Sequence, residues 1–438
     1  MDNGEFHKCF AYDHCSVTGV RSSGFLASRR SPECEWTEQP RLYSPSDYIS
    51  VMVTSERRPW IILAGCFLMS TGFNAYLFGP ASLIPLLVDQ FAIDKASAGL
   101  SISALFLGWV LLQIPGGFLM DRYDNRRLVW IGMIVFAFVS LAGYLSSTYT
   151  VFLVTRFLGG GAAVFLWTTN ANIVSQSFPA STRAVATSLF ITSAPVGVTI
   201  AQFIGPHIAS VSGWRAIFFV YPLVSLLGMV VLYWAAREPI RTPSQLDLST
   251  FVKTLSNPTI LLVSLSSFCA YSLFVFFNSW MPTYATEVLA LDLASAGAIT
   301  ALVPLAGIVA RPGGGWLSDR IGDRRRPVIA FAFLLSLPIL GGISVVTSTS
   351  RFAILLFLAG IGSQLGTGVF YVYVSELSDQ ETQGTQLAIL TTLSMAGAFI
   401  APAVAGWLVD EVSWGAAFVF TGLIGIIGIA TIVVAPRS

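Results

Sequence analysis

Two arginines, Arg156 and Arg311, offer the most specific chemistry in this sequence, because both lie well inside long apolar stretches. No Asp or Glu occupies the central part of any such stretch. If these stretches cross a bilayer, an arginine at that depth costs about 2.5–3.5 kcal/mol, which a wet cavity, backbone carbonyls or an anion must offset. A guanidinium is a rigid fork of donors that suits a carboxylate or similar planar anion. We therefore predict that both arginines contact a small anion. Two alternatives stay open: Arg156 could hold helices together, and Arg311 could extend toward the membrane interface.

Other polar and aromatic side chains within the apolar stretches are further candidates for ligand contact. They are Asn74, Tyr76, Asn170, Gln202, Tyr271, Asn278, Gln364 and Tyr371. Each of them could equally serve in hydrogen bonding between helices. Relative to the centres of their stretches, Arg156 and Arg311 are displaced toward opposite surfaces of the membrane. We therefore expect them to contact a ligand one after the other rather than at the same time.

Catalytic and metal-binding chemistry finds little support in the sequence. There are three histidines, no His-Glu-x-x-His pattern and no pair of aspartates at depth. A cluster of His7, Cys9, His14 and Cys15 has a spacing that matches no zinc pattern well, and we interpret the five cysteines as free thiols. We expect no enzyme activity, no catalytic residue, no metal site and no cofactor.

The elements that position these side chains are predicted to be membrane-spanning helices. Hydrophobic residues make up 54% of the chain and charged residues 11%, a balance that a soluble domain could not solvate. A helix needs about 20 mostly apolar residues to span the hydrocarbon core. Twelve such windows occur, at 60–88, 96–119, 128–146, 150–174, 184–211, 214–236, 258–286, 294–317, 327–347, 352–375, 385–409 and 414–436. They are too long for barrel strands and lack the alternation of a barrel. The predicted fold is therefore an all-α integral membrane protein.

The longest break between windows divides them six and six. The predicted organisation is a disordered cytoplasmic tail at 1–56, a six-helix bundle at 57–236, a cytoplasmic linker at 237–257 and a second six-helix bundle at 258–438. Lys and Arg collect strongly in the loops on one side, which places both termini in the cytoplasm. We expect a multi-pass protein of the plasma membrane that works as a monomer, with the bilayer and a small molecule as partners and no nucleic acid.

The same charged pattern follows the second window of each half. It begins at Gly117 and at Gly315, and it contains an acid and several arginines: Asp121, Arg122, Arg126 and Arg127 in the first copy, Asp319, Arg320, Arg324 and Arg325 in the second. A carboxylate at the end of one helix can accept hydrogen bonds from the free N–H groups of a facing helix start, and it can pair with the arginines. Such a latch can hold helix ends together in one state and release them in another. The alternative is that these arginines only fix the topology.

This duplicated loop resembles that of the major facilitator superfamily, Gly-x-Leu-x-Asp-Arg-x-Gly-x-Arg-Arg. Gly315 to Arg325 match it fully, and Gly117 to Arg127 match it with one departure, Asp124 in place of the second glycine. The resemblance covers about residues 57–437. It implies two pseudo-symmetric six-helix bundles that carry a substrate by alternating access, and it assigns a gating role to the loop residues named above.

The resemblance also bears on Arg311. Ala310-Arg311-Pro312-x-Gly314 is similar to the corresponding span of carboxylate-carrying branches, including the monocarboxylate transporters. Those transporters have an aspartate one helical turn earlier, where this sequence has Gly307. The lack of acids at depth favours anion exchange or uniport over proton symport. The remaining alternative is a multidrug efflux transporter of the same superfamily, which would often use a buried acid for cationic drugs.

Overall fold

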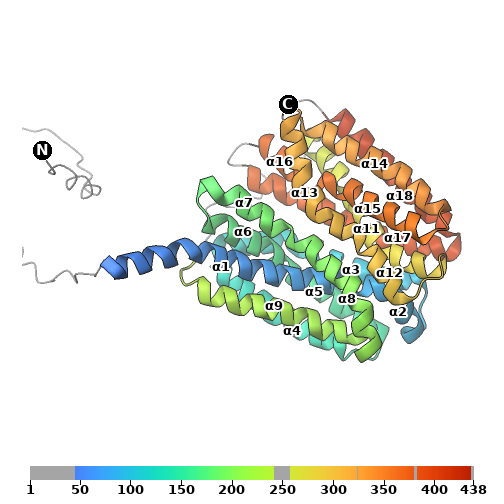
Figure 1. Cartoon of the computed structure of the whole chain (residues 1–438), viewed down its shortest axis with the longest axis horizontal. Coiled ribbons are helices and arrows are strands. Elements are labelled where there is room, and N and C mark those ends of the chain that lie inside the picture. Colours follow the sequence, from blue (N-terminus) through green and yellow to red (C-terminus); the bar gives the residue numbers. More distant parts are fainter. Residues whose placement is uncertain (1–44, 241–256, 323, 379–381, 436–438) are drawn as a thin grey trace, which may run out of the picture. The chain divides into compact units, whose positions relative to one another are not determined.

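The computed structural model describes residues 45–240, 257–322, 324–378 and 382–435, with side chains from residue 57 onward. Residues 1–44 of the predicted tail and 241–256 of the predicted linker lie outside the described residues, as do His7, Cys9, His14 and Cys15. The described part is helical, with no strand among its elements (Figure 1).

The first half of the chain contains nine α-helices and three short helical turns. These elements are α1 Pro45–Phe78, η1 Gly79–Leu83, α2 Ile84–Phe91, α3 Lys95–Arg122, α4 Asn125–Tyr144, α5 Tyr149–Ala163, η2 Val164–Thr168, α6 Thr169–Ser177, α7 Ala180–Ile191, α8 Ser193–Ser212, η3 Trp214–Ala216 and α9 Ile217–Ala235. The second half contains α11 Pro258–Glu287, α12 Leu293–Thr300, α13 Leu302–Arg320, α14 Arg325–Val345, α15 Thr349–Leu365, α16 Thr367–Glu376, α17 Gln383–Glu411 and α18 Trp414–Val434.

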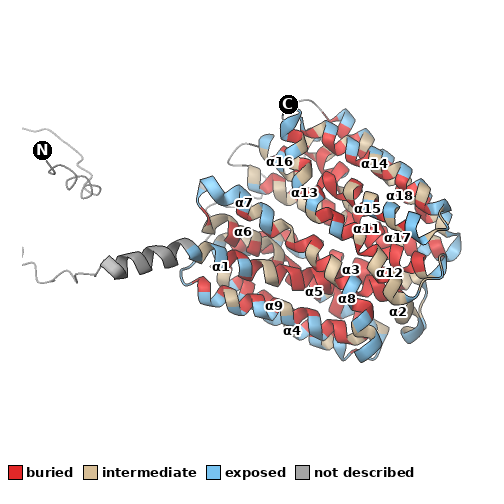
Figure 2. Ribbon diagram, viewed as in Figure 1, coloured by how far each residue is buried: buried red, intermediate tan, exposed pale blue. Residues whose placement is uncertain are grey.

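Twelve helical stretches in the described part are long and apolar enough to cross a membrane. Their bounds agree with the predicted windows to within a few residues, so the predicted fold class is confirmed. Large apolar side chains such as Phe138 and Trp234 are exposed on the outer faces of the helices, and Figure 2 shows buried residues along the inward faces. A hydrocarbon solvent explains this exposure, because lipid tails are as apolar as the side chains themselves.

Several spans are broken part-way, and the breaks coincide with proline or glycine. The first span changes from α1 to the η1 turn at Gly79–Pro80, the fifth breaks between α7 and α8 close to Pro195, and the tenth breaks at Gly366. Proline lacks the N–H group that would continue the backbone hydrogen bonds of the helix, and glycine makes the helix easier to bend. A proline leaves the carbonyl four residues earlier without its usual donor, and inside the membrane that carbonyl needs another one.

Glycines allow close helix crossings at matching places in the two halves. A methyl group at Gly160 would overlap the Leu105 carbonyl where α5 crosses α3. In the second half, a methyl group at Gly314 would overlap the Leu365 carbonyl where α13 crosses α15. In lipid, the hydrophobic effect does not drive helices together. Small residues stabilise such crossings because they let the two backbones pack closely.

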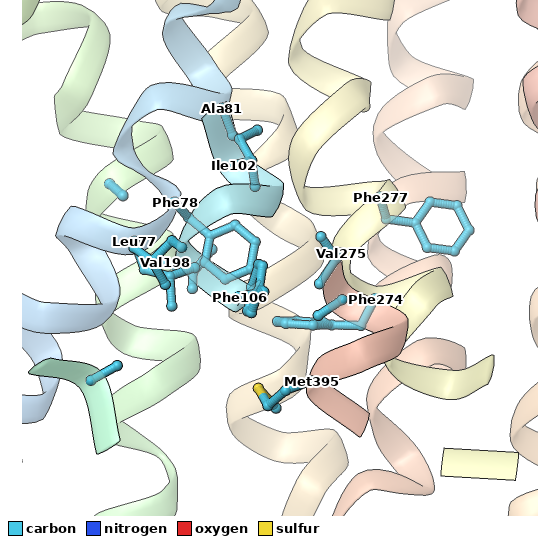
Figure 3. Close-up of a cluster of buried hydrophobic side chains, with 14 of the residues drawn as sticks. Leu77, Phe78, Ala81, Ile102, Phe106, Val198, Phe274, Val275, Phe277 and Met395 are labelled. Carbon is cyan, nitrogen blue, oxygen red and sulfur yellow. The ribbon is translucent and has the colours of Figure 1, made fainter. Parts of the chain in front are cut away.

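The two halves meet along α3 with α17 and along α8 with α12 and α13. A cluster of buried apolar side chains bridges them, drawn in Figure 3. At its centre the Phe78 ring lies 5.7 Å from the Phe274 ring and 6.1 Å from the Phe106 ring, with edge-to-face geometry. These residues belong to α1, α11 and α3, so the cluster packs spans of both halves together.

Candidate functional site

Arg311 on α13 is 7% exposed, and its guanidinium is held by uncharged groups only. Its Nε donates to Oε1 of Gln364 on α15 at 3.0 Å, and Nη1 lies 3.5 Å from the carbonyl oxygen of Ile191 on α7, in the other half. The guanidinium carbon lies 5.6 Å from the ring centre of Phe274, and Tyr271 and Tyr371 are close neighbours of the group. Within the described residues, Nη2 donates to no protein acceptor.

Gln364 is fixed in this position by a second hydrogen bond, from Nε2 to the carbonyl oxygen of Val303 at 3.0 Å. Its amide lies against Gly307, where an added methyl group would overlap it. The position one helical turn before Arg311 therefore has room for a side chain only if the Gln364 amide moves away. A neutral amide partners the arginine, and the guanidinium charge stays uncompensated.

Arg156 on α5 stands in a different environment. It is fully buried, and its Nε, Nη1 and Nη2 donate to the carbonyl oxygens of Ser101, Tyr76 and Leu77 at 3.1, 3.1 and 2.7 Å. The carbonyl of Tyr76 would normally accept from the residue four positions on, which is Pro80 and has no N–H. Arg156 therefore supplies donors at the break between α1 and η1. Its guanidinium carbon also lies 4.8 Å from the Tyr76 ring centre, a cation–π contact.

The four remaining candidates have side-chain amides that bond within or between helices. Asn74 donates to the Ser70 carbonyl at 2.8 Å, and Asn170 donates to the Leu166 carbonyl at 2.7 Å. Gln202 on α8 reaches across to α11, where its Nε2 lies 2.9 Å from the carbonyl oxygen and 3.2 Å from Oδ1 of Asn278. The structure thus gathers Gln364, Tyr271 and Tyr371 around Arg311, and it places Tyr76 with Arg156 and Gln202 with Asn278.

An open cavity of about 320 Å³ lies between the two halves, next to the residue that follows Arg311 in the chain. It is lined by Pro312 of α13 and by Ala184, Val185, Ser188, Leu189 and Thr192 at and around α7. The charged loops join helix ends on one side of the spans. We call these the inner ends, and the opposite ones the outer ends.

At the outer ends, an ion-pair cluster joins the two halves. Lys95 Nζ, at the start of α3, lies 3.2 Å from Oε1 of Glu287 on α11 and 3.7 Å from Oδ1 of Asp410 on α17. The backbone N–H of Ala96 donates to Oδ2 of Asp410 at 2.9 Å. Close by, α3 and α17 approach so tightly that a methyl group at Gly406 would overlap the Lys95 carbonyl.

The second charged loop forms a network at the inner end of its own half. Arg325 is 8% exposed, pairs with Glu376 on α16 at 2.8 Å, and also contacts Asp319 and Ser318. Arg320 lies over the Trp316 ring, with 5.1 Å between its guanidinium carbon and the ring centre. Arg324 is exposed at the start of α14, and Gly315 is partly buried.

The first charged loop instead holds the start of the segment between the halves. Asp124 pairs with Arg126 at 2.8 Å and accepts the backbone N–H of Ile240 at 3.0 Å, while Arg126 donates to the Ala236 carbonyl at 2.9 Å. Partial burial by itself would raise the pKa of Asp124, but the hydrogen bonds from Arg126 and Ile240 outweigh it and lower the pKa below its ordinary value. The other predicted gating residues of this loop lie along the end of α3 and the start of α4: Gly117 is buried, Asp121 is partly buried, and Arg122 and Arg127 are exposed.

Comparison with known proteins decides the family. The sequence model of the Major Facilitator Superfamily matches residues 62–350 and 324–438, nearly the whole described part of the chain. The chain belongs to the Major Facilitator Superfamily. It is a membrane transporter rather than an enzyme, as the sequence analysis predicted.

Relatives within the superfamily are distant but cover most of the chain. The hexuronate transporter of Bacillus subtilis is 24% identical over 85% of this chain and 92% of its own length. A probable nitrate/nitrite antiporter of Thermus thermophilus is 29% identical over 75% of this chain and 80% of its own. The crystal structure of a bacterial homologue of the human lysosomal transporter Spinster, in an inward-facing and occupied conformation, superposes with a TM-score of 0.70 at 17% identity, covering 86% of this chain and 96% of that one. This likeness confirms the superfamily fold.

Sequence reasoning missed several charged residues that the superfamily fold brings together. Lys95, Glu287 and Asp410 stand at the ends of different windows, and only the packing of the halves unites them. Glu376 directly follows the predicted window 352–375, and its pairing with Arg325 likewise depends on the packing. The role of Arg156 had a readable signal, because Pro80 predicts a free carbonyl one turn earlier, at Tyr76.

Proposed function

We propose that the protein carries a small anion across the membrane by alternating access and that the anion binds to the Arg311 guanidinium. The observation that carries the proposal is the environment of Arg311. A cation buried between the two halves, with neutral partners and a donor free of protein acceptors, is costly unless an anion or water completes it. Gln364, Tyr271 and Tyr371 are neutral polar groups around the same point, and we assign them to the substrate as well.

The relatives' names support an anionic substrate. They include the hexuronate transporter, probable galactarate/D-glucarate transporters, a cis,cis-muconate transport protein and a probable sulfoacetate transporter. These compounds share a carboxylate or a sulfonate, which a guanidinium binds through two parallel hydrogen bonds.

Alternating access is supported by the difference between the two ends. At the outer ends the halves are joined by the Lys95 ion pairs and by the contact of Gln202 with Asn278. Toward the inner ends the cavity beside Pro312 separates α7 from α13. We assign this state as closed outside and open inside, with the inner ends and both termini in the cytoplasm and the protein in the plasma membrane. A single chain suffices, because the site lies between its own two halves.

The titratable groups inside the spans indicate whether anion transport is coupled to protons. In the described spans no carboxylate lies near Arg311, and its partner Gln364 does not titrate. Proton symport of this kind needs an ionisable acid in the membrane. We therefore propose anion exchange or uniport.

A binding screen tests the substrate class. The purified protein is heated with small carboxylates, sulfonates, nitrate, neutral sugars and hydrophobic cations, and its melting temperature is measured. We expect stabilisation by one or more anions and none by neutral sugars. Stabilisation by hydrophobic cations alone would contradict the proposal and favour a multidrug transporter.

A further inference from the structure

The charges at depth set a limit on the charge of the substrate. In the described spans, Arg156 and Arg311 are the only fully charged side chains well inside the bilayer. Since no acid accompanies them, any charge balance at the site must come from the ligand. The number of guanidinium groups that can reach the ligand therefore decides how many negative charges it can bring.

Arg156 is already held by the protein at every nitrogen of its guanidinium. Three of its nitrogens donate to carbonyl oxygens, and two of these belong to the break in the first span. The side chain is fully buried and packed against the Tyr76 ring. To contact a ligand, Arg156 would have to abandon carbonyls that lack another donor in the membrane, which is unfavourable.

Of the two guanidinium groups well inside the described spans, only that of Arg311 has a nitrogen that donates to no protein acceptor. The groups assembled around it are an amide, two phenol hydroxyls and an aromatic ring, all of them neutral. These groups can accept or donate hydrogen bonds to hydroxyls and carbonyls of a ligand. They cannot neutralise a second carboxylate, and burying an ionised carboxylate without a charged partner is strongly unfavourable.

We infer that the site selects ligands with one negative charge, such as a hexuronate or another monocarboxylate, over ligands with two, such as a hexarate. This inference rests on the proposed function and narrows its substrate class. The relatives' names do not decide the charge. They include monoanions, hexuronate and nitrate/nitrite, at 24% and 29% identity, and dianions, galactarate/D-glucarate, cis,cis-muconate and sulfoacetate, at 22–24% identity.

Matched pairs of anions test the inference on the wild-type protein. Two pairs share a skeleton and differ by one charge: D-glucuronate with D-glucarate, and a dicarboxylate with its monoamide. Nitrate with sulfate adds a pair of inorganic ions that differ by one charge. Affinities are measured by titration at pH 7, where both acids of a dicarboxylate are ionised. We expect the monoanion to bind at least tenfold more tightly in every pair that binds at all.

The possible outcomes are distinct. A dianion that binds as tightly as its monoanionic partner, or more tightly, overturns the inference and leaves anion transport standing. Failure of every anion in all pairs overturns the proposed function, and the inference with it.

The variant Arg156→Gln adds a second test of the same reasoning. It should lower the melting temperature but leave the ratio of monoanion to dianion affinity unchanged within about twofold. A selective loss of dianion binding would show that Arg156 supplies a second charge and would overturn the inference.

Discussion

The contact between Gly307 and Gln364 makes a prediction that separates binding from folding. In the variant Gly307→Ala the new methyl group overlaps the Gln364 amide. The amide is the far end of a flexible side chain, so it can move away without shifting the backbone. By moving it gives up the hydrogen bond from Arg311 and its own donation to the Val303 carbonyl.

The size of the effect follows from these two bonds. A hydrogen bond to a charged group contributes about 1.5–3 kcal/mol and a neutral one about 0.5–1.5 kcal/mol. Replacing glycine by alanine in a helix stabilises the helix by about 1 kcal/mol. We expect the free energy of unfolding to fall by about 1–3 kcal/mol. The loss of the amide that aims Arg311 should weaken anion binding by about tenfold or more, which corresponds to about 1.4 kcal/mol.

Gly313→Ala is the matched control, because it changes the same helix at a position where an added methyl group meets no atom within 4 Å. Its melting temperature should equal or exceed that of the wild type, and its anion affinity should be unchanged. Melting curves and anion titrations on both variants complete the assay. If Gly307→Ala binds the anion as tightly as Gly313→Ala does, Gln364 does not position Arg311 and the reasoning fails.

Three further predictions concern groups outside the Arg311 site. Lys95→Gln removes two partly exposed ion pairs, each worth about 0.2–1 kcal/mol, so the balance between inward-open and outward-open states should shift several-fold toward outward-open. Accessibility of an engineered outer cysteine to a charged reagent measures this shift, and unchanged labelling would contradict it. Arg156→Met leaves carbonyls at the first-span break without donors and should lower the melting temperature by more than Arg351→Met, at an exposed arginine; equal melting would contradict this. Because the folded pKa of Asp124 is lowered, its contribution to stability is present above the unfolded pKa of about 3.9 and is lost as the pH falls through the folded value. Asp124→Asn should therefore be less stable than the wild type at pH 7, with a difference that shrinks below about pH 4, and a constant difference would refute the assignment.

The fold could be predicted from the sequence because the bilayer imposes simple rules. Apolar length fixes the number of spans, and the duplicated loop at Gly117 and Gly315 marks the equivalence of the halves. The breaks were less predictable, since proline or glycine within a membrane helix is often tolerated without one. At Gly79–Pro80 the chain enters a tight turn, but other internal prolines, such as Pro115 in α3, leave the helix intact.

The candidate site was predictable in its composition and not in its arrangement. Charge and depth identified Arg156 and Arg311 together, because both are unpaired arginines in apolar spans. Their difference depends on neighbours from other spans: Arg156 meets the freed carbonyls of α1, whereas Arg311 meets the amide of Gln364 and the Ile191 carbonyl of the other half. The outer ion pairs of Lys95 likewise depend on how α3, α11 and α17 pack, which no local pattern specifies.

The most direct test of the central claim is anion uptake into proteoliposomes by Arg311→Gln. Arg351→Gln serves as the control, because it removes the same charge from an exposed position. We predict that Arg311→Gln folds, reaches the membrane and loses anion uptake by at least 100-fold, while Arg351→Gln transports like the wild type. Uptake by Arg311→Gln within a few-fold of the control would contradict the claim that this guanidinium holds the transported anion.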